Sequence, residues 1–165
     1  MNREISCSIT GHRPEKLPWG NREEDPRCLS LKETLLQTLE SYYVKGYRHF
    51  LSGMARGTDL YFCELVLQLK AQHPNITLEA VIPYAGQADL WPCRDRLRYT
   101  QILAQCDFET VVQHSYSQGC LQRRNRYLVD HAACLIGVYN GRGGGTLYTL
   151  RYGLEQGIDV TVLDV

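Results

Sequence analysis

The sequence lacks a net charge, because eighteen Lys and Arg residues balance eighteen Asp and Glu residues over 165 residues. Without an overall positive field, the chain as a whole is not attracted to a polyanion or to an anionic membrane surface. Contact with nucleic acid would have to come from a local basic patch. Nucleic acid is therefore not the favoured partner.

Long apolar runs are also missing. No stretch of about eighteen consecutive apolar residues occurs, and the first residues lack the basic start and apolar segment of a signal peptide. The seven cysteines include no CxxC pair, and several lie in apolar segments, as expected for reduced, buried thiols. We therefore expect a cytoplasmic protein with no membrane partner.

Motifs for metal binding and covalent catalysis are missing as well. The five histidines and seven cysteines never fall at ligand spacing such as HxxxH or CxxC. Neither a GxSxG nucleophile turn nor the GK[ST] of a Walker loop occurs. We expect no metal site, and the sequence favours binding over any particular reaction.

Short apolar runs alternate with longer helical patterns along the chain. Strands are expected at 4–9, 47–52, 77–82, 108–112, 133–139 and 159–164. Such alternation is typical of parallel strands joined by right-handed crossovers. The prediction is a single Rossmann-like domain over 1–165: an α/β, doubly wound, mainly parallel sheet of about six strands with helices on both faces.

Polar and glycine-rich segments follow four of these runs: "TGHRP", "SGMARGTD", "PYAGQ" and "NGRGGGT". Ligands of open parallel sheets bind in a crevice at the carboxyl ends of the strands. Glycine and proline also end strands without any further role, so each segment alone has a second interpretation. Four such segments together favour a binding site.

The segment "NGRGGGT" is suited to an anion. Gly143, Gly144 and Gly145 leave the backbone N–H groups bare, and Thr146 can cap the helix that follows. Exposed N–H groups and the positive end of a helix dipole attract phosphate or carboxylate.

The segment "SGMARGTD" has two possible roles. Gly53 and Gly57 allow close approach of a ligand, and Arg56 could pair with an anion. Asp59 would repel phosphate, so it is expected either to bind ribose hydroxyls or to cap the helix. Glu64 lies about two turns beyond Gly57 in an otherwise apolar helix, where a carboxylate is costly unless it is paired or faces a cleft.

Two further groups are candidates for ligand contact. Arg124 and Asn125 lie in "RRNR", where arginine can grip phosphate or belong to a solvated helix face balanced by Asp130. His12 and Arg13 follow the first expected strand, where they could face a ligand or be ordinary surface residues.

Taken together, these segments resemble the SLOG superfamily of Rossmann-like nucleotide-binding domains, most closely its YpsA-like group of bacterial proteins. The resemblance is carried by "ITGHRPEKL", "SGMARGTDLYFCEL", "IPYAGQADLW" and "RRNRYLVDHAACLIGVYNGRGGGTLYTLRYGLEQG". It implies a pocket for a nucleotide or an ADP-ribose-like ligand. The residues that would line the pocket are Gly11, His12, Arg13, Gly53, Gly57, Asp59, Glu64, Arg124, Asn125 and the loop 143–146.

More distant resemblances imply two alternatives. "GGGT" is similar to the PGGxGTxxE signature of Lonely guy phosphoribohydrolases, although Thr149 replaces the glutamate. If the protein is an enzyme, Glu64 and Asp59 would be the catalytic residues of a nucleotide N-glycosidic hydrolase.

"SGMARGTD" and "RNRYLVD" are similar to segments of the DNA-processing protein DprA/Smf. A module of that kind would bind single-stranded DNA through a basic patch. That patch would consist of Arg94, Arg96, Arg98, Arg123, Arg124 and Arg126. Relatives in this superfamily also imply a homodimer as an open possibility.

Overall fold

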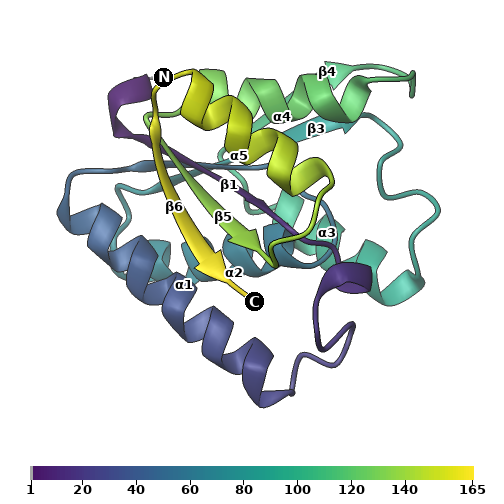
Figure 1. The fold of residues 1–165 in the computed structure, drawn as a ribbon, viewed down its shortest axis with the longest axis horizontal. Coiled ribbons are helices and arrows are strands. Elements are labelled where there is room, and N and C mark those ends of the chain that lie inside the picture. The colour runs from purple at the N-terminus through teal and green to yellow at the C-terminus, as the bar shows by residue number, and fades with distance from the viewer. Residues whose placement is uncertain (1) are drawn as a thin grey trace.

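A computed structural model describes residues 2–165 and places all strands in one six-stranded sheet (Figure 1). Every neighbouring pair of strands is parallel. The strands are β1 (Ser6–Gly11), β2 (His49–Ser52), β3 (Thr77–Tyr84), β4 (Phe108–Gln113), β5 (Cys134–Tyr139) and β6 (Asp159–Asp164). All six expected strands are present, and the sheet is parallel throughout.

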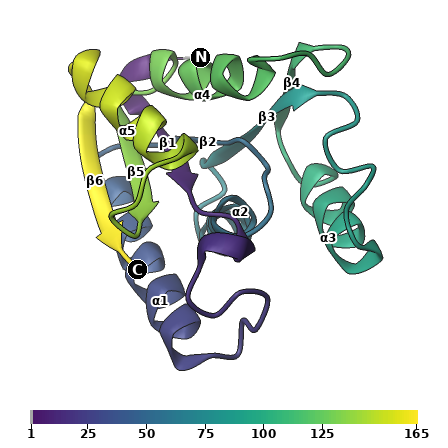
Figure 2. The same cartoon turned by 45° about the vertical axis from the view of Figure 1, so that its right-hand side comes forward.

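Five α-helices connect the strands and cover both faces of the sheet. They are α1 (Pro26–Val44), α2 (Thr58–Gln72), α3 (Cys93–Leu103), α4 (Cys120–Asp130) and α5 (Gly145–Glu155). Short 3-10 helices form at η1 (Arg3–Ile5) and η2 (Pro14–Lys16). Figures 1 and 2 show α4 and α5 on one side of the sheet and α1 and α2 on the other. The predicted Rossmann-like architecture is confirmed.

The strand order β4-β3-β2-β1-β5-β6 creates a reversal in the middle of the sheet. The chain moves outward from β1 to β4 and then returns to place β5 on the other side of β1. Because the connections leave β1 and β5 in opposite directions, a crevice opens at their carboxyl ends. Ligand sites of open parallel sheets lie at such reversals.

Helix α2 is apolar almost all round because it lies against both the sheet and its helical neighbours. Leu60, Phe62 and Val66 are at most 1% exposed and belong to the main core with Phe50 and Leu78 of the sheet. Helix α1 buries the face that includes Leu31, Leu35, Leu39 and Tyr42. The core therefore fixes the first turn of α2 firmly beneath the carboxyl edge of the sheet.

The long connection between β1 and α1 is also anchored. Leu17 and Trp19 are buried, and the indole Nε1 of Trp19 donates a hydrogen bond to Tyr61 Oη at 3.2 Å. At its end, Asp25 caps α1 by accepting from the N–H of Arg27, with Pro26 in the first turn. The connection thus holds residues 11–16 over the carboxyl edge of the sheet.

Candidate functional site

A cavity of about 570 Å³ lies at the reversal, with the carboxyl end of β1 on one side and the first turn of α5 on another. Segments from four parts of the chain line it. The lining residues are Ile9, Thr10, Gly11, His12, Arg13, Glu15, Lys16, Ala55, Asp59, Leu121, Gln122, Arg124, Asn125, Leu128, Gly144, Gly145, Thr146 and Tyr148. Its size is within the usual range for small-molecule sites.

Two buried charges of opposite sign line this cavity. Asp59, in the first turn of α2, is 6% exposed, and Arg124, on α4, is 4% exposed. Charged side chains are rarely buried so deeply unless they are paired or meet a ligand. Whether their polar atoms all have partners within the protein therefore distinguishes a structural pair from a ligand site.

Asp59 uses only one of its carboxylate oxygens within the protein. Oδ2 accepts a hydrogen bond from the N–H of Ala55 at 3.1 Å, and Oδ1 has no partner among residues 2–165. Burial raises the pKa of Asp59, against the opposing influence of the Arg124 charge and the Ala55 N–H. The free oxygen can accept hydrogen bonds from hydroxyl groups of a ligand.

Arg124 is held in place by its neighbours but keeps donor capacity. Its Nη1 donates to the carbonyl oxygen of Gly53, and its Nε donates to Asn125 Oδ1 at 2.8 Å. Nη2 has no acceptor among residues 2–165. Within that range Ser8 Oγ is the one unpartnered polar side-chain atom that is fully enclosed, so Nη2 of Arg124 and Oδ1 of Asp59 both retain access to the cavity.

His12 connects the two loops that form the cavity rim. Its Nε2 accepts a hydrogen bond from the N–H of Asn140 at 3.0 Å, and its Nδ1 lies 3.3 Å from Thr146 Oγ1. Burial lowers the pKa of His12, which favours the neutral ring that can accept this bond. His12 lines the cavity, but both of its ring nitrogens have partners within the protein.

The first turn of α5 provides backbone donors at the opposite wall. Gly144 is its N-cap with φ of 132°, and no side chain caps the helix. The Nζ of Lys16 approaches this loop and donates to the carbonyl oxygen of Gly143 at 3.4 Å. Bare N–H groups, a helix dipole and a nearby ammonium together favour an anionic group here.

The turn between β2 and α2 is strained and locked. Met54 is buried with φ of 57°, a conformation that costs a non-glycine residue about 1–3 kcal/mol. Its N–H donates to Ser52 Oγ at 3.1 Å, and Ser52 in turn donates to the carbonyl oxygen of Asp59 at 3.3 Å. The strained backbone of Met54 is thus part of the turn that places Asp59 in the cavity lining.

Nine residues singled out from the sequence do line the cavity. They are Gly11, His12, Arg13, Asp59, Arg124, Asn125, Gly144, Gly145 and Thr146. Five others do not: Gly53, Arg56, Gly57, Glu64 and Gly143. Gly143 instead lines an adjacent hollow with Lys16 and Arg142.

Gly53 and Gly57 are required by protein neighbours rather than by a ligand. A Cβ on Gly53 would lie 2.5 Å from Arg124 Nη1. Gly57 has φ of +83°, and a Cβ there would lie 2.8 Å from the carbonyl oxygen of His12. Both glycines serve the cavity indirectly, by admitting the residues that form it.

Of the two alternatives left open for Glu64, pairing or a place in a cleft, the structure shows pairing. Glu64 is exposed and accepts hydrogen bonds from Arg98 on α3, outside the cavity. Seven residues of helix separate it from Gly57 and raise it by about 10 Å along the axis, away from the carboxyl edge. Arg56 is also turned aside, toward Glu15 and Asp95.

The cavity is also lined by three residues that the sequence motifs do not mark: Lys16, Gln122 and Tyr148. Lys16 is part of the polar segment "GHRPEKL". Its charge alone does not predict which way a loop residue points. Gln122 and Tyr148 lie near the starts of α4 and α5. Their position in the first turns of these helices is the feature of the sequence from which a place near the cavity could have been predicted.

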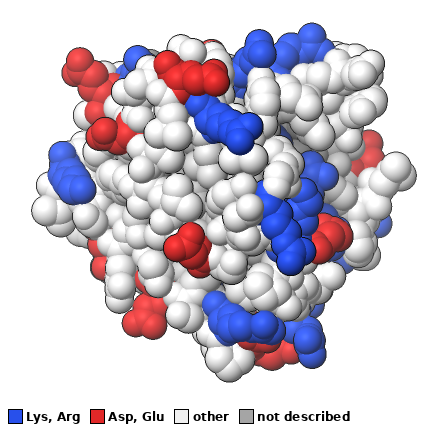
Figure 3. All heavy atoms as spheres, in the orientation of Figure 1, with Lys and Arg blue, Asp and Glu red and all other residues white. Residues whose placement is uncertain are grey.

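The six arginines considered as a DNA-binding patch are divided. Three of them lie on α3 and three on α4, and four donate hydrogen bonds to protein partners: Arg98, Arg123, Arg124 and Arg126. On the face drawn in Figure 3, basic and acidic residues occur in separate small groups. The described chain does not present these arginines as one surface.

Neither a metal cluster nor a membrane-spanning helix occurs in the part of the chain that the structure describes. Among residues 2–165, no group of three His, Cys, Asp or Glu side chains is arranged to hold a metal ion. Over the same range, no helix has the length and apolar character needed to cross a membrane.

The sequence profile of the YspA SLOG family matches residues 7–156, so the chain belongs to this family. It is 30% identical over 142 residues to the SPbeta prophage-derived protein YoqJ of Bacillus subtilis, covering 78% of this chain and 83% of that protein. It is 24% identical over 142 residues to the UPF0398 protein YpsA of the same organism, covering 84% and 78%. The resemblance noted in the sequence is confirmed.

Solved structures of DNA processing protein A (DprA) share the fold. The Streptococcus pneumoniae protein matches with a TM-score of 0.60 at 19% identity, covering 96% of this chain and 50% of that one. The Helicobacter pylori protein, described for its single-stranded DNA binding mode, matches with a TM-score of 0.64 at 16% identity, covering 97% and 65%. This chain therefore spans only half to two thirds of those proteins, and the likeness concerns the fold.

Proposed function

We propose that the protein binds a nucleotide or nucleotide derivative, such as ADP-ribose, in the cavity between β1 and β5. The observation that carries the proposal is the pair of buried charges, Asp59 and Arg124, which each keep an unpartnered atom accessible to that cavity. Burying charge without completing its hydrogen bonds is costly, and a ligand with both hydroxyl and anionic groups would offset that cost.

The cavity suggests an orientation for the ligand. The first turn of α5, with Gly144, Gly145 and nearby Lys16, suits a phosphate. Asp59 carries negative charge and suits the hydroxyl groups of a ribose. A nucleotide would then span the cavity with its phosphate toward α5 and its sugar toward α2. Exposed Arg13, whose charge acts on Asp59 and Arg124, adds a further positive charge to the cavity lining.

The proposal is tested by calorimetric titration of the purified protein with AMP, NAD and ADP-ribose. We expect saturable binding of at least one of them, and loss of that binding in Asn125→Ala and Asp59→Asn. Glu109→Gln is a matched control because Glu109 is exposed on β4, outside the cavity. If none of the three compounds binds, the proposal is wrong.

Hydrolysis of a nucleotide N-glycosidic bond is a second candidate, favoured by the position of Asp59. A buried carboxyl group in a cavity, with its pKa raised by burial, is suited to proton transfer or to stabilising positive charge on the ribose. Glu64 has no part in this version of the proposal. Incubation with AMP or NAD should release free base, and Asp59→Asn should abolish the release. Wild-type protein that releases no base would contradict this candidate.

Binding of single-stranded DNA, cytoplasmic location and a homodimer stay further proposals. The divided arginines give DNA binding little support. An electrophoretic shift at low salt that weakens steeply with added salt would support it. Sedimentation velocity at several concentrations would test the dimer.

A further inference from the structure

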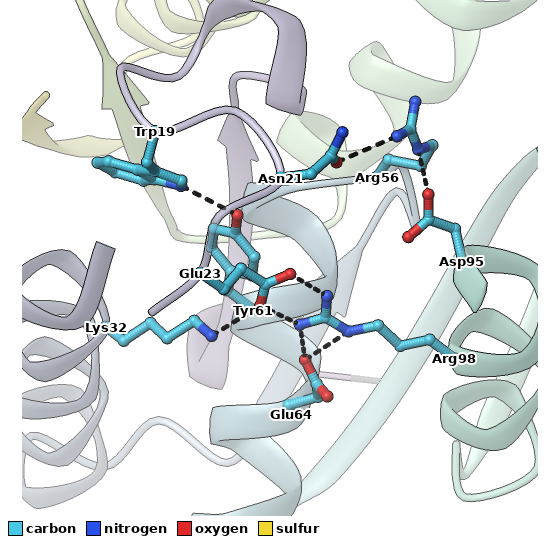
Figure 4. Close-up of polar contacts among 9 residues, drawn as sticks. All are labelled: Trp19, Asn21, Glu23, Lys32, Arg56, Tyr61, Glu64, Asp95 and Arg98. Carbon is cyan, nitrogen blue, oxygen red and sulfur yellow. Dashed lines mark hydrogen bonds and ion pairs between the residues drawn. The ribbon is translucent and has the colours of Figure 1, made fainter. Parts of the chain in front are cut away.

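The connection between β1 and α1 begins at the cavity and contributes to two arginine-centred clusters, whose residues other than Glu15 are drawn in Figure 4. The Arg56 cluster consists of Arg56, Glu15, Asn21 and Asp95. The Arg98 cluster consists of Arg98, Glu23, Lys32 and Glu64. Each cluster joins the connection to helix α3, which does not itself line the cavity.

Arg56 distributes its three guanidinium nitrogens over three partners. Nη1 donates to Glu15 Oε1 at 2.8 Å, Nε donates to Asp95 Oδ2 at 2.8 Å, and Nη2 donates to Asn21 Oδ1 at 3.3 Å. The Arg56 side chain is 16% exposed and that of Asp95 is 17% exposed. The Arg56–Asp95 pair is therefore less screened than a surface ion pair, whereas the Glu15 side chain is 63% exposed and its pair with Arg56 is partly screened.

Arg98 fixes the other half of the connection. Its Nη1 and Nη2 donate to both oxygens of Glu23, at 2.6 and 2.9 Å, and its Nε donates to Glu64 Oε1 at 2.9 Å. Lys32 adds a bond to Glu23 at 2.8 Å. Burial by itself raises the pKa of Glu23, but the bonds from Arg98 and Lys32 outweigh it and lower the pKa. The bidentate pair keeps this part of the connection against α2 and α3.

Glu15 gives the Arg56 cluster its relevance to the cavity. Glu15 is one of the residues that line the cavity, and together with Lys16 and Gly143 it also lines the adjacent hollow. A free carboxylate there would repel an anionic ligand. Because Arg56 pairs with it, the charge is neutralised and the side chain is drawn toward α3.

We infer that Arg56 is a positioning residue of the cavity: it neutralises Glu15 and ties residues 12–16 to α3, with Arg98 fixing the segment that follows. The inference rests on the proposed function for its effect on binding. Arg56 does so without touching the ligand, which explains why it lies next to the cavity but outside its lining. Helix α3 thereby acts as the support of a loop on which the shape and charge of the cavity depend.

The positioning role is tested first without any ligand, by hydrogen-deuterium exchange of the whole chain. We expect Arg56→Gln and Arg98→Gln to increase exchange in residues 12–24 several-fold, with exchange in β3 and β5 unchanged. Arg96→Gln is the matched control, because Arg96 is exposed on the same helix and belongs to neither cluster. Unchanged exchange in residues 12–16 of Arg56→Gln would overturn the inference, whatever the result for Arg98→Gln.

The charge role is tested by titration with ADP-ribose, AMP and NAD. Arg56→Gln should weaken the best binder about tenfold, and the double variant Arg56→Gln/Glu15→Gln should recover most of that loss. A purely structural Arg56 would give no recovery when Glu15 is neutralised, and that result would overturn the charge role. If the wild-type protein binds none of the three, the proposed function fails, while the exchange experiment still decides the positioning role.

Discussion

Two groups of buried charges in this molecule differ in how completely they are satisfied. The first is the pair of Asp59 and Arg124 in the cavity, where one atom of each side chain has no partner within residues 2–165. The second joins His49 and Glu79 beneath α4, and neither of these residues lines the cavity. Both groups belong to the same sheet and its helices, so the difference between them is in the hydrogen bonds that each group makes.

Glu79 uses both of its oxygens. Oε2 accepts from His49 Nε2 at 2.7 Å, and Oε1 accepts from Thr110 Oγ1 at 2.7 Å and Tyr127 Oη at 3.0 Å. The other ring nitrogen of His49 lies 2.7 Å from Thr77 Oγ1. A buried cluster with all of its bonds made stabilises the fold, whereas one with bonds left open is suited to a ligand.

The largest expected effect is on the satisfied cluster. Glu79→Ala removes an acceptor from three donors and should lower the free energy of unfolding by about 3–5 kcal/mol, as measured by urea denaturation. Glu109→Ala, an exposed position on neighbouring β4, should change it by less than about 0.5 kcal/mol. Equal effects of the two substitutions would show that the buried cluster is not stabilising.

The same cluster predicts an acid dependence. Burial raises the pKa of Glu79, but the bonds from His49, Thr110 and Tyr127 outweigh it and lower the pKa below 4.5. The stabilisation is therefore complete above pH 4.5 and is lost as the pH falls through the lowered value. The stability difference between wild type and Glu79→Gln should shrink over that range, and a constant difference would contradict the assignment.

The next largest effect is expected at Asp59, which has an unpartnered oxygen within residues 2–165. Asp59→Asn should cost about 2 kcal/mol of ligand binding, or about thirtyfold in affinity, because a charged acceptor is lost. Stability should change little, since Asn can still accept from the Ala55 N–H and the cost of burying a carboxylate is removed. Calorimetry and thermal melting measure the two quantities, with exposed Asp89→Asn as control. A large loss of stability with unchanged affinity would reverse our interpretation of Asp59.

A smaller effect concerns His12, which links the two rims. Burial lowers its pKa below 6.5, so the neutral ring is favoured in the folded state. The stabilisation is present above pH 6.5 and is lost as the pH falls through the lowered value, because a protonated Nε2 cannot accept from Asn140. The free energy of unfolding, measured by urea denaturation between pH 8 and pH 5, should therefore fall by about 1 kcal/mol more for wild type than for His12→Gln. Parallel curves would exclude this role.

The smallest effect is expected at the rim. Arg13 is exposed and forms no ion pair within residues 2–165, so Arg13→Gln should weaken an anionic ligand only about threefold. The loss should disappear at high salt, because exposed charges are screened. Arg22→Gln, at an exposed position of the same connection outside the cavity, should have no effect. An effect that persists at high salt would place Arg13 in a buried contact instead.

The sequence by itself determined the alternation of strands and helices, because periodicity and glycine-rich strand ends follow from local chemistry. It also pointed to Asp59 and the glycine loop before α5, since they follow the ends of parallel strands, and to Arg124 through the cluster of basic residues in "RRNR".

Only the tertiary structure decided what each of these residues meets. Gly53 admits Arg124 rather than a ligand, Arg56 turns toward Glu15, and Glu64 pairs with Arg98. The physical reason is that a helix or turn fixes the direction of a side chain, but its partner comes from a distant part of the chain. Whether a buried charge is satisfied, and hence whether it stabilises the fold or awaits a ligand, depends on that partner.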